Sequence, residues 1–272
     1  MRKFSTDPAQ IFVSAWKNRQ LLWRMTKRQI LAQYRGSVLG LAWSFFIPLI
    51  MLGVYTFVFS TVFKARWNTG GDSKTEFALV LFVGMIIHSF FSENMNRAPS
   101  LITDNVSYVK KVIFPLEILP WITIGVVAFQ LVVSLFVWLL FFWIINMSVN
   151  WTVIFLPVVL MPLIFFTLGI NFLFASLGVY FRDISQITAT LSTILLFLSP
   201  IFYPASMLPA PFKDLVYVNP LTYFIEDARA ALMWGELPNW TGWGVSMFVS
   251  LLVAWLGFFW FQKTRKGFAD VI

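Results

Sequence analysis

The side chains that could do chemistry are few in this chain, and their spacing assembles no catalytic group. His88 is the only histidine, and the chain contains no cysteine. The missing cysteines exclude disulfides, thiol catalysis and cysteine-ligated metal. No pair of carboxylates and no Ser/His/Asp set stands at a spacing suited to acid–base or nucleophilic work. The sequence therefore argues against catalysis by this chain.

The chain also lacks a loop for nucleotide phosphates. No segment reads G-x-x-x-x-G-K-[ST], the loop whose backbone N–H groups cradle the phosphates of ATP. We therefore expect no cofactor and no metal on this chain. If the protein moves a solute uphill, the energy must come from a partner subunit or from an ion gradient.

His88 and Glu93 lie in or beside an apolar stretch, where a polar group should face the protein interior. For His88 we expect a structural hydrogen bond rather than a proton relay, and for Glu93 an anchoring or pairing role. The interiors of the long apolar stretches hold no Asp or Glu, which disfavours an ion-coupled carrier. No selectivity-filter sequence supports a simple ion channel either.

The composition places these residues in a membrane protein. Hydrophobic residues make up 59% of the chain and charged residues only 12%, and the mean hydropathy is +0.78. A soluble domain averages about 25% charged residues. The polar residues of this chain are therefore too few to coat a water-facing globule.

Six apolar segments are long enough, or nearly so, to cross a bilayer as helices, which takes about 20 residues. The second and the fifth are short, and we expect them to extend into their flanks. The chain is therefore predicted to be an all-α membrane protein with six transmembrane helices. The predicted spans are residues 38–63, 77–91, 116–145, 151–180, 184–198 and 243–261.

The positive charges orient these spans. With both ends inside, fifteen of the twenty Lys and Arg residues fall on the inner side, which predicts cytoplasmic termini. The first residues, MRKFSTDPAQIF, do not read as a signal peptide, because a second basic cluster precedes any apolar run. We therefore expect the N-terminus to stay in the cytoplasm.

Residues 18–35 precede the first span and are predicted to form an amphipathic helix that lies on the membrane. Basic residues share one arc of this helix, and aromatic residues lie on a neighbouring stripe. Such a helix sets cations near anionic lipid and rings at the boundary. A plain basic flank explains the same residues equally well. The residues concerned are Trp23, Arg24, Lys27, Arg28, Tyr34 and Arg35.

Two other segments between spans stand out. Residues 97–111 are predicted to hold a short helix, from Pro99 or Ser100 through Asn105, that suits docking to a partner; an ordinary polar loop is the alternative. Residues 199–240 hold five prolines before Leu221, yet they are too apolar for a solvated loop. We predict short helices that dip into the outer leaflet, one of them capped by Asn219.

Aromatic residues crowd the first span on every face. Aromatic rings stack on the C–H faces of sugars, but they also pack against each other. The residues alone favour packing over a sugar path. The span carries Trp43, Phe45, Phe46, Tyr55, Phe57, Phe59 and Phe63.

Several motifs together resemble the ABC-2-type permeases of polysaccharide exporters, including those for O-antigen, capsule and teichoic acid. They run through most of the chain: QYRGSVLGLAWSFFIPL, LEILPW, GVYFRDI, SPIFYP and NPLTYFIEDAR. The resemblance implies one transmembrane domain over residues 1–272 in the bacterial inner membrane. It implies a homodimer with two copies of a nucleotide-binding subunit that carries ATP and Mg. The implied substrate is a lipid-linked polysaccharide, with membrane lipids and no nucleic acid as other partners.

The resemblance also implies roles for individual residues. The first and fifth spans would line a channel at the dimer centre, with Phe46, Tyr55 and Phe59 as candidates for sugar contact. Residues 97–111 would hold the coupling helix for the ATPase. Two alternatives stay open, an ABC-2 permease for a drug or small lipid and a gradient-driven carrier. The coupling candidates are Arg97, Asp104, Lys110, Lys111, Arg182 and Asp183.

Overall fold

The protein is described by a computed structural model that covers residues 6–58, 74–110 and 114–272. Within these ranges all regular structure is helical, and no strand occurs. Five helical segments are long and apolar enough to cross a membrane, which confirms an all-α, multi-pass membrane protein. They are Gly40–Val58, Thr75–Arg97, Leu116–Asn146, Trp151–Tyr180 and Trp240–Val271.

Each of these segments is built around one main helix. Short 3-10 turns and helices extend several of them, as at η1 (Gly40–Ala42), η4 (Leu116–Ile118) and η5 (Trp151–Phe155). The second and sixth predicted spans are longer in the structure than in the sequence prediction. The main helices are α3 (Trp43–Tyr55), α4 (Lys74–Arg97), α6 (Leu119–Asn146), α8 (Met161–Tyr180) and α12 (Trp240–Thr264).

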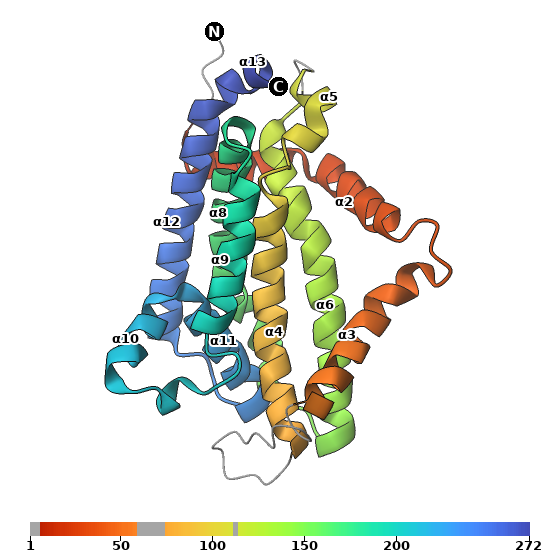
Figure 1. Cartoon of the computed structure of the whole chain (residues 1–272), viewed down its shortest axis with the longest axis vertical. Coiled ribbons are helices and arrows are strands. Elements are labelled where there is room, and N and C mark those ends of the chain that lie inside the picture. The colour runs from red at the N-terminus through yellow and green to blue at the C-terminus, as the bar shows by residue number, and fades with distance from the viewer. Residues whose placement is uncertain (1–5, 59–73, 111–113) are drawn as a thin grey trace.

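The predicted fifth span is the helix α9, Ile184–Leu198, with the bounds that the sequence predicted. Its 15 residues correspond to about 22 Å at 1.5 Å per residue, less than the roughly 30 Å of a hydrocarbon core. α9 runs beside α4 and α8 in the bundle (Figure 1). The count of six spans therefore stays a prediction that depends on α9.

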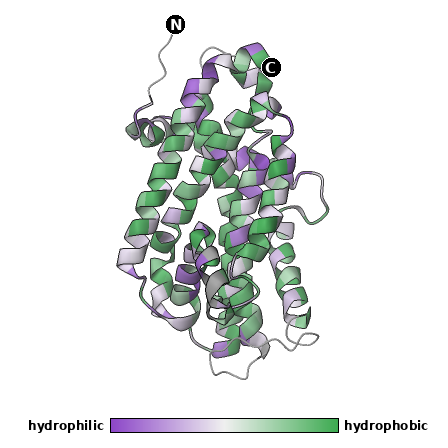
Figure 2. Ribbon diagram, turned by 60° about the vertical axis from the view of Figure 1, so that its left-hand side comes forward, coloured by the Kyte–Doolittle hydropathy of each residue, from purple (hydrophilic) through white to green (hydrophobic). Residues whose placement is uncertain are grey.

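α4 is the central helix of the bundle. In its most apolar window 72% of the residues are buried, against 17% in the segment that contains α3. α8 and α12 pack closest of all, because a Cβ at Gly257 would lie 2.1 Å from the carbonyl oxygen of Gly169. Small residues at such crossings let membrane helices approach each other closely. Hydrophobic residues dominate along these long helices (Figure 2).

The short helices gather at two opposite ends (Figure 1). One end holds the N-terminal helices, the C-terminus and α5; we call it the inner end, because we predict that it faces the cytoplasm. The other, outer end holds the helices of residues 199–240. The inner helices are α1 (Ala9–Lys17), α2 (Arg19–Gln33), α5 (Val106–Val109) and α13 (Phe268–Val271); the outer ones are α10 (Ala210–Val218) and α11 (Pro220–Arg229).

The outer segment folds into short helices, as its prolines predicted. The Asn219 side chain accepts a hydrogen bond from the backbone N–H of Leu221 at 3.0 Å, so the predicted cap of α11 is confirmed. After α11 the chain continues as a π-helical turn over Ala230–Trp234. The position of these helices in the outer leaflet stays a prediction.

The predicted short helix from Pro99 or Ser100 through Asn105 is wrong in its position. Residues 98–102 form turns, and the helical part runs through Thr103–Asn105 and α5 instead. Packing explains the difference, because a Cβ at Gly178 of α8 would lie 2.1 Å from the Pro99 carbonyl oxygen. This close approach holds the backbone of Pro99 against α8 and sets the local turn.

Candidate functional site

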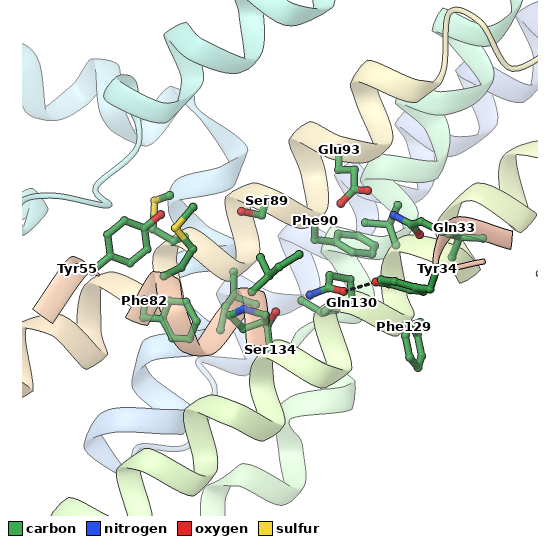
Figure 3. A pocket seen from close by; sticks show the side chains of 18 residues that line it. Gln33, Tyr34, Tyr55, Phe82, Ser89, Phe90, Glu93, Phe129, Gln130 and Ser134 are labelled. Atoms are coloured by element: carbon green, nitrogen blue, oxygen red, sulfur yellow. Dashed lines mark hydrogen bonds between the residues drawn. The ribbon is translucent and has the colours of Figure 1, made fainter. Parts of the chain in front are cut away.

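A cavity of about 330 Å³ lies between the end of α2 and the helices α3, α4 and α6. Polar side chains face it from two helices: Ser89 and Glu93 from α4, and Gln130 and Ser134 from α6 (Figure 3). Gln33 and Tyr34 at the end of α2 and mainly apolar residues of α3, α4 and α6 line the rest. A few convergent polar groups in an apolar pocket are typical of binding sites for small molecules.

Gln130 ties three elements together at this cavity. Its side-chain oxygen accepts a hydrogen bond from the Tyr34 hydroxyl at 3.3 Å, and its Nε2 donates to the Ser44 carbonyl oxygen at 3.1 Å. Burial raises the pKa of the Tyr34 phenol, and the nearby Glu93 carboxylate raises it further. Sequence reasoning did not single out Gln130, although an amide in the middle of a long apolar segment was a usable signal.

The predicted sugar-contact residues fall in different places. Tyr55 lines the cavity, with its ring 6.2 Å from that of Phe82. Phe46 is 39% exposed, is not part of the cavity wall, and packs edge-on against Phe45 with the ring centres 6.1 Å apart. Phe59 lies outside the described residues. Of the two described candidates, Tyr55 lines the cavity and Phe46 does not, and sugar contact stays a prediction.

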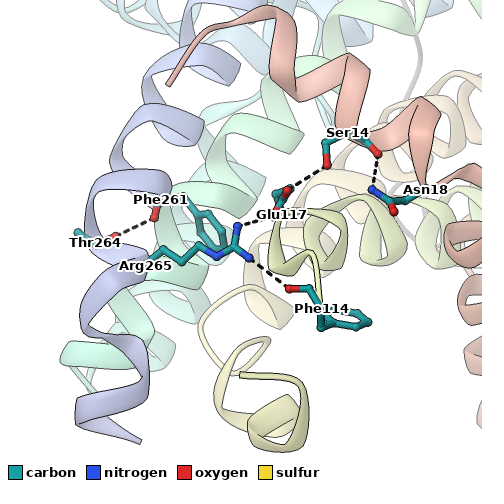
Figure 4. Close-up of polar contacts among 7 residues, drawn as sticks. All are labelled: Ser14, Asn18, Phe114, Glu117, Phe261, Thr264 and Arg265. Atoms are coloured by element: carbon teal, nitrogen blue, oxygen red, sulfur yellow. Dashed lines mark hydrogen bonds and ion pairs between the residues drawn. The ribbon is translucent and has the colours of Figure 1, made fainter. Parts of the chain in front are cut away.

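A second polar cluster joins distant parts of the chain at the inner end (Figure 4). Glu117 forms an ion pair with Arg265, and its other oxygen accepts a hydrogen bond from the Ser14 hydroxyl at 3.1 Å. Both side chains of the pair are largely buried. Sequence reasoning missed Glu117, although a carboxylate at the start of an apolar span was a signal for a buried partner.

This cluster continues to the helix α5 and to α2. Arg265 donates to the Phe114 carbonyl oxygen at 3.2 Å, and the Phe114 ring stacks on Tyr108 with the ring centres 4.4 Å apart. The Tyr108 hydroxyl accepts a hydrogen bond from Arg28 at 3.1 Å. The segment that was predicted to dock a partner is therefore hydrogen-bonded to α2, and it stacks on Phe114, which Arg265 binds just beyond the end of α12.

Five of the six predicted coupling residues are described, and they lie at the inner end on separate elements. Arg97 donates to Glu93, four residues earlier on α4, at 2.5 Å, and Asp104 accepts from the Ser100 hydroxyl at 2.7 Å. Lys110 is exposed. Arg182 and Asp183 are exposed where α8 joins α9 (Figure 1). Lys111 lies outside the described residues.

α2 has one side packed against α6 and one exposed side, as an interface helix would require. Met25 and Thr26 are buried, and Thr26 packs against α6, where a Cβ at Gly125 would lie 3.0 Å from its methyl group. The predicted basic residues Arg24, Lys27, Arg28 and Arg35 are exposed, and Trp23 is 67% exposed. The location of this helix on a membrane stays a prediction.

Arg229 of the outer segment is buried inside the bundle. Arg229 is one of the five Lys and Arg residues that the charge count left on the outer side, but its side chain is fully buried. It donates to the carbonyl oxygens of Val80 at 3.1 Å, Pro200 at 2.5 Å and Ile201 at 3.0 Å. Burial lowers the pKa of its guanidinium to about 9, and Glu226 partly opposes that shift. Arg229 thus fastens α11 to α4 and to the end of α9.

His88 has the structural role that the sequence predicted. It is buried, and its Nε2 lies 3.1 Å from the carbonyl oxygen of Ser192 on α9. A carbonyl oxygen only accepts, so Nε2 carries the proton in this contact. The hydrogen bond links α4 to α9.

Comparison with known proteins places this arrangement among transporters. The model of the ABC-2 type transporter family matches residues 20–233. The chain is 27% identical to the O-antigen export system permease protein RfbA of Myxococcus xanthus, over 94% of this chain and 97% of the relative. It is 24% identical to the protein of the same name from Klebsiella pneumoniae, over 93% and 95% of the two chains.

Proposed function

Because the chain belongs to the ABC-2 type transporter family, we propose that it is the permease subunit of an ATP-driven exporter of polysaccharide. The cargo is an O-antigen-like, lipid-linked polymer that crosses the bacterial inner membrane. The similarity to O-antigen export permeases over nearly the full length of both chains carries this proposal. ATP hydrolysis belongs to a separate subunit, since this chain has no phosphate-binding loop.

The proposed assembly contains two copies of this chain and two copies of the ATPase, which bind ATP and Mg. The poor burial of the segment that contains α3 supports a second copy, since only 17% of its apolar window is covered. α9 likewise exposes Ile187 and Phe197. In this assembly α9 is the fifth of six spans, and α3 and α9 face a channel between the two copies.

The contacts at the inner end support a route for the energy of ATP. Residues 97–111 dock on the ATPase in this proposal. A displacement of this segment would reach α8 through the contact of Pro99 with Gly178. It would reach the end of α12 through Phe114 and Arg265. It would reach α2 through the hydrogen bond between Tyr108 and Arg28. Movement of these helices then opens the inner side of the channel to the polymer.

Deletion of the gene for the partner ATPase tests the proposal. We expect surface polysaccharide to disappear and the lipid-linked polymer to accumulate inside the cell, with recovery by the intact ATPase gene. An ATPase with a substituted phosphate-loop lysine is the matched control and should not restore export. Continued export without the ATPase would overturn the proposal. Intact surface polysaccharide together with a lost drug tolerance would favour the small-substrate alternative.

A further inference from the structure

We propose that the cavity between α2, α3, α4 and α6 binds the sugar-bearing head of the lipid-linked cargo, before the polymer reaches the central channel. The hydroxyls of the head would contact the polar side chains of α4 and α6. The hydrocarbon anchor would lie along the apolar wall of Ile47, Met51 and Met85. This inference rests on the proposed function and adds to it a binding site within one subunit.

The polar residues of the cavity form two facing rows. Ser89 and Glu93 are one helical turn apart on α4, and Gln130 and Ser134 are one turn apart on α6 (Figure 3). Polar side chains within membrane helices are costly unless they face protein or a polar ligand. Hydroxyl, amide and carboxylate groups together offer the donors and acceptors that sugar hydroxyls require.

Glu93 is held ready to accept a hydrogen bond. Arg97 donates to its Oε1 at 2.5 Å, which fixes the carboxylate, and its Oε2 remains an acceptor for a ligand hydroxyl. Gln130 is fixed in a similar way between Tyr34 and Ser44. Two polar groups with defined orientation can select a ligand more sharply than mobile side chains.

The cavity has the depth of one leaflet. Glu93 and Phe82 both line it and are eleven residues apart on α4, about 16 Å along the helix axis. This is close to half of a hydrocarbon core of about 30 Å. Glu93 lies toward the inner end, so the cavity fits one amphiphile that approaches from the cytoplasmic leaflet.

The distribution of polar groups favours a glycolipid over a phospholipid. A phospholipid without a sugar would bring only its chains to the middle of this cavity. Ser89 and Ser134 would then face methylene groups without a polar partner, which is unfavourable. The hydroxyls of a sugar match the polar groups of both rows.

The cavity lies beside a helix that stands away from the bundle. α3 follows α2 after a sharp turn that contains Gly36 at φ +87° and Gly40 at φ +52°. Glycine adopts this left-handed backbone at little cost. α2 leads away from the bundle to this turn, and α3 runs from the turn back toward α6, so the start of α3 stands apart from α6 (Figure 1). A lipid can therefore reach the α3 wall from the side, within a single copy of the chain.

Site-specific photocrosslinking tests the inference. Benzoylphenylalanine replaces either Met51, which lines the cavity, or its neighbour Ile50, which is similarly exposed but not part of the cavity wall. The permease is assembled with its ATPase in phospholipid nanodiscs that contain a polyprenyl-diphosphate-linked N-acetylhexosamine probe. We expect the probe to label the position of Met51 several-fold more than that of Ile50. Equal labelling at both positions, or phospholipid adducts alone, would overturn the inference.

A second pair of variants distinguishes loss of a specific cavity contact from a general loss of structure. Ser134→Val removes one hydroxyl from the cavity, and we expect it to lower probe labelling at Met51 by about fivefold, the effect of losing one hydrogen bond. Ser246→Val makes the same change on α12 and should leave labelling as it was. Unchanged labelling in Ser134→Val would count against the sugar contact.

The same preparation separates this inference from the proposed function. If the wild-type assembly exports polysaccharide with ATP but the probe does not prefer Met51 over Ile50, the cavity site is wrong and the function stands. If the probe labels Met51 and the assembly exports no polysaccharide, the function is wrong and the site stands as a glycolipid site.

Discussion

Glu117 and Arg265 are 148 positions apart in the sequence and form an ion pair at the inner end of the bundle. The side chains are only 17% and 11% exposed, respectively. Ser14 of α1 donates to the same carboxylate. The pair therefore joins the first described helix, the start of the third span and the end of α12, close to the segment that we propose docks the ATPase.

Glu117→Gln should destabilise the protein markedly. The substitution leaves the Arg265 cation largely buried without its counter-charge, and breaking such a pair costs roughly 3 kcal/mol. The loss should appear as a lower midpoint of thermal unfolding in nanodiscs. The matched control is Glu93→Gln, which breaks the half-exposed pair with Arg97 and should cost less than about 1 kcal/mol. Equal losses in both variants would show that burial does not govern these pairs.

Arg229→Met should prevent the outer segment from folding onto the bundle. The carbonyl oxygens of Val80, Pro200 and Ile201 would lose their donor in a buried site, at about 1–3 kcal/mol for each group. We expect little folded protein in membranes, measured by size-exclusion chromatography of a fluorescent fusion. Arg182→Met, on an exposed residue, should accumulate normally. A wild-type yield of Arg229→Met would show that the three hydrogen bonds of Arg229 are not needed to hold the outer segment.

Asp227 gives the outer segment a pH dependence. Burial, together with the smaller effect of the neighbouring Glu226 carboxylate, raises the pKa of its carboxyl from 3.8 to about 6. The folded protein therefore binds a proton at Asp227 more tightly than the unfolded chain does. The free energy of unfolding consequently falls as the pH rises from 3.8 through about 6. Asp227→Asn should raise the unfolding midpoint above pH 6, and its advantage should shrink as the pH falls towards 3.8. The same substitution at the exposed Asp183 is the control. An advantage that does not vary with pH would contradict this assignment.

The sequence predicted the long helices well, because apolar runs must span or pack whatever their neighbours are. The bounds of α9 and the cap at Asn219 matched the structure for this reason, since both depend on local residues. The polar sites at Gln130, Glu117 and Arg229 were missed because they depend on contacts between distant parts of the chain. Arg229 is buried because a segment folds back onto α4, and charge counting by loops assumes that every loop faces water.

Sites that form by contacts between distant segments could not be predicted from local sequence patterns. The cavity takes Tyr34, Glu93 and Gln130 from three helices, and no periodicity within one helix shows that their side chains meet. The turn at Pro99 was misplaced because its backbone conformation is set by α8, a neighbour that is distant in sequence. The resemblance supplied the location of the coupling segment but not the contacts that hold it.

Gly178→Ala should uncouple ATP hydrolysis from transport. A Cβ at this position would lie 2.1 Å from the Pro99 carbonyl oxygen, and both sides of the contact are backbone. The chain before α5 must therefore shift, at a cost of roughly 1–3 kcal/mol. We expect ATP hydrolysis by the nanodisc assembly to respond less to the lipid-linked polymer, with reduced export. Gly244→Ala is the control, because a Cβ there meets nothing within 4 Å. If Gly178→Ala exports at the wild-type rate, contact between Pro99 and α8 does not position the coupling segment.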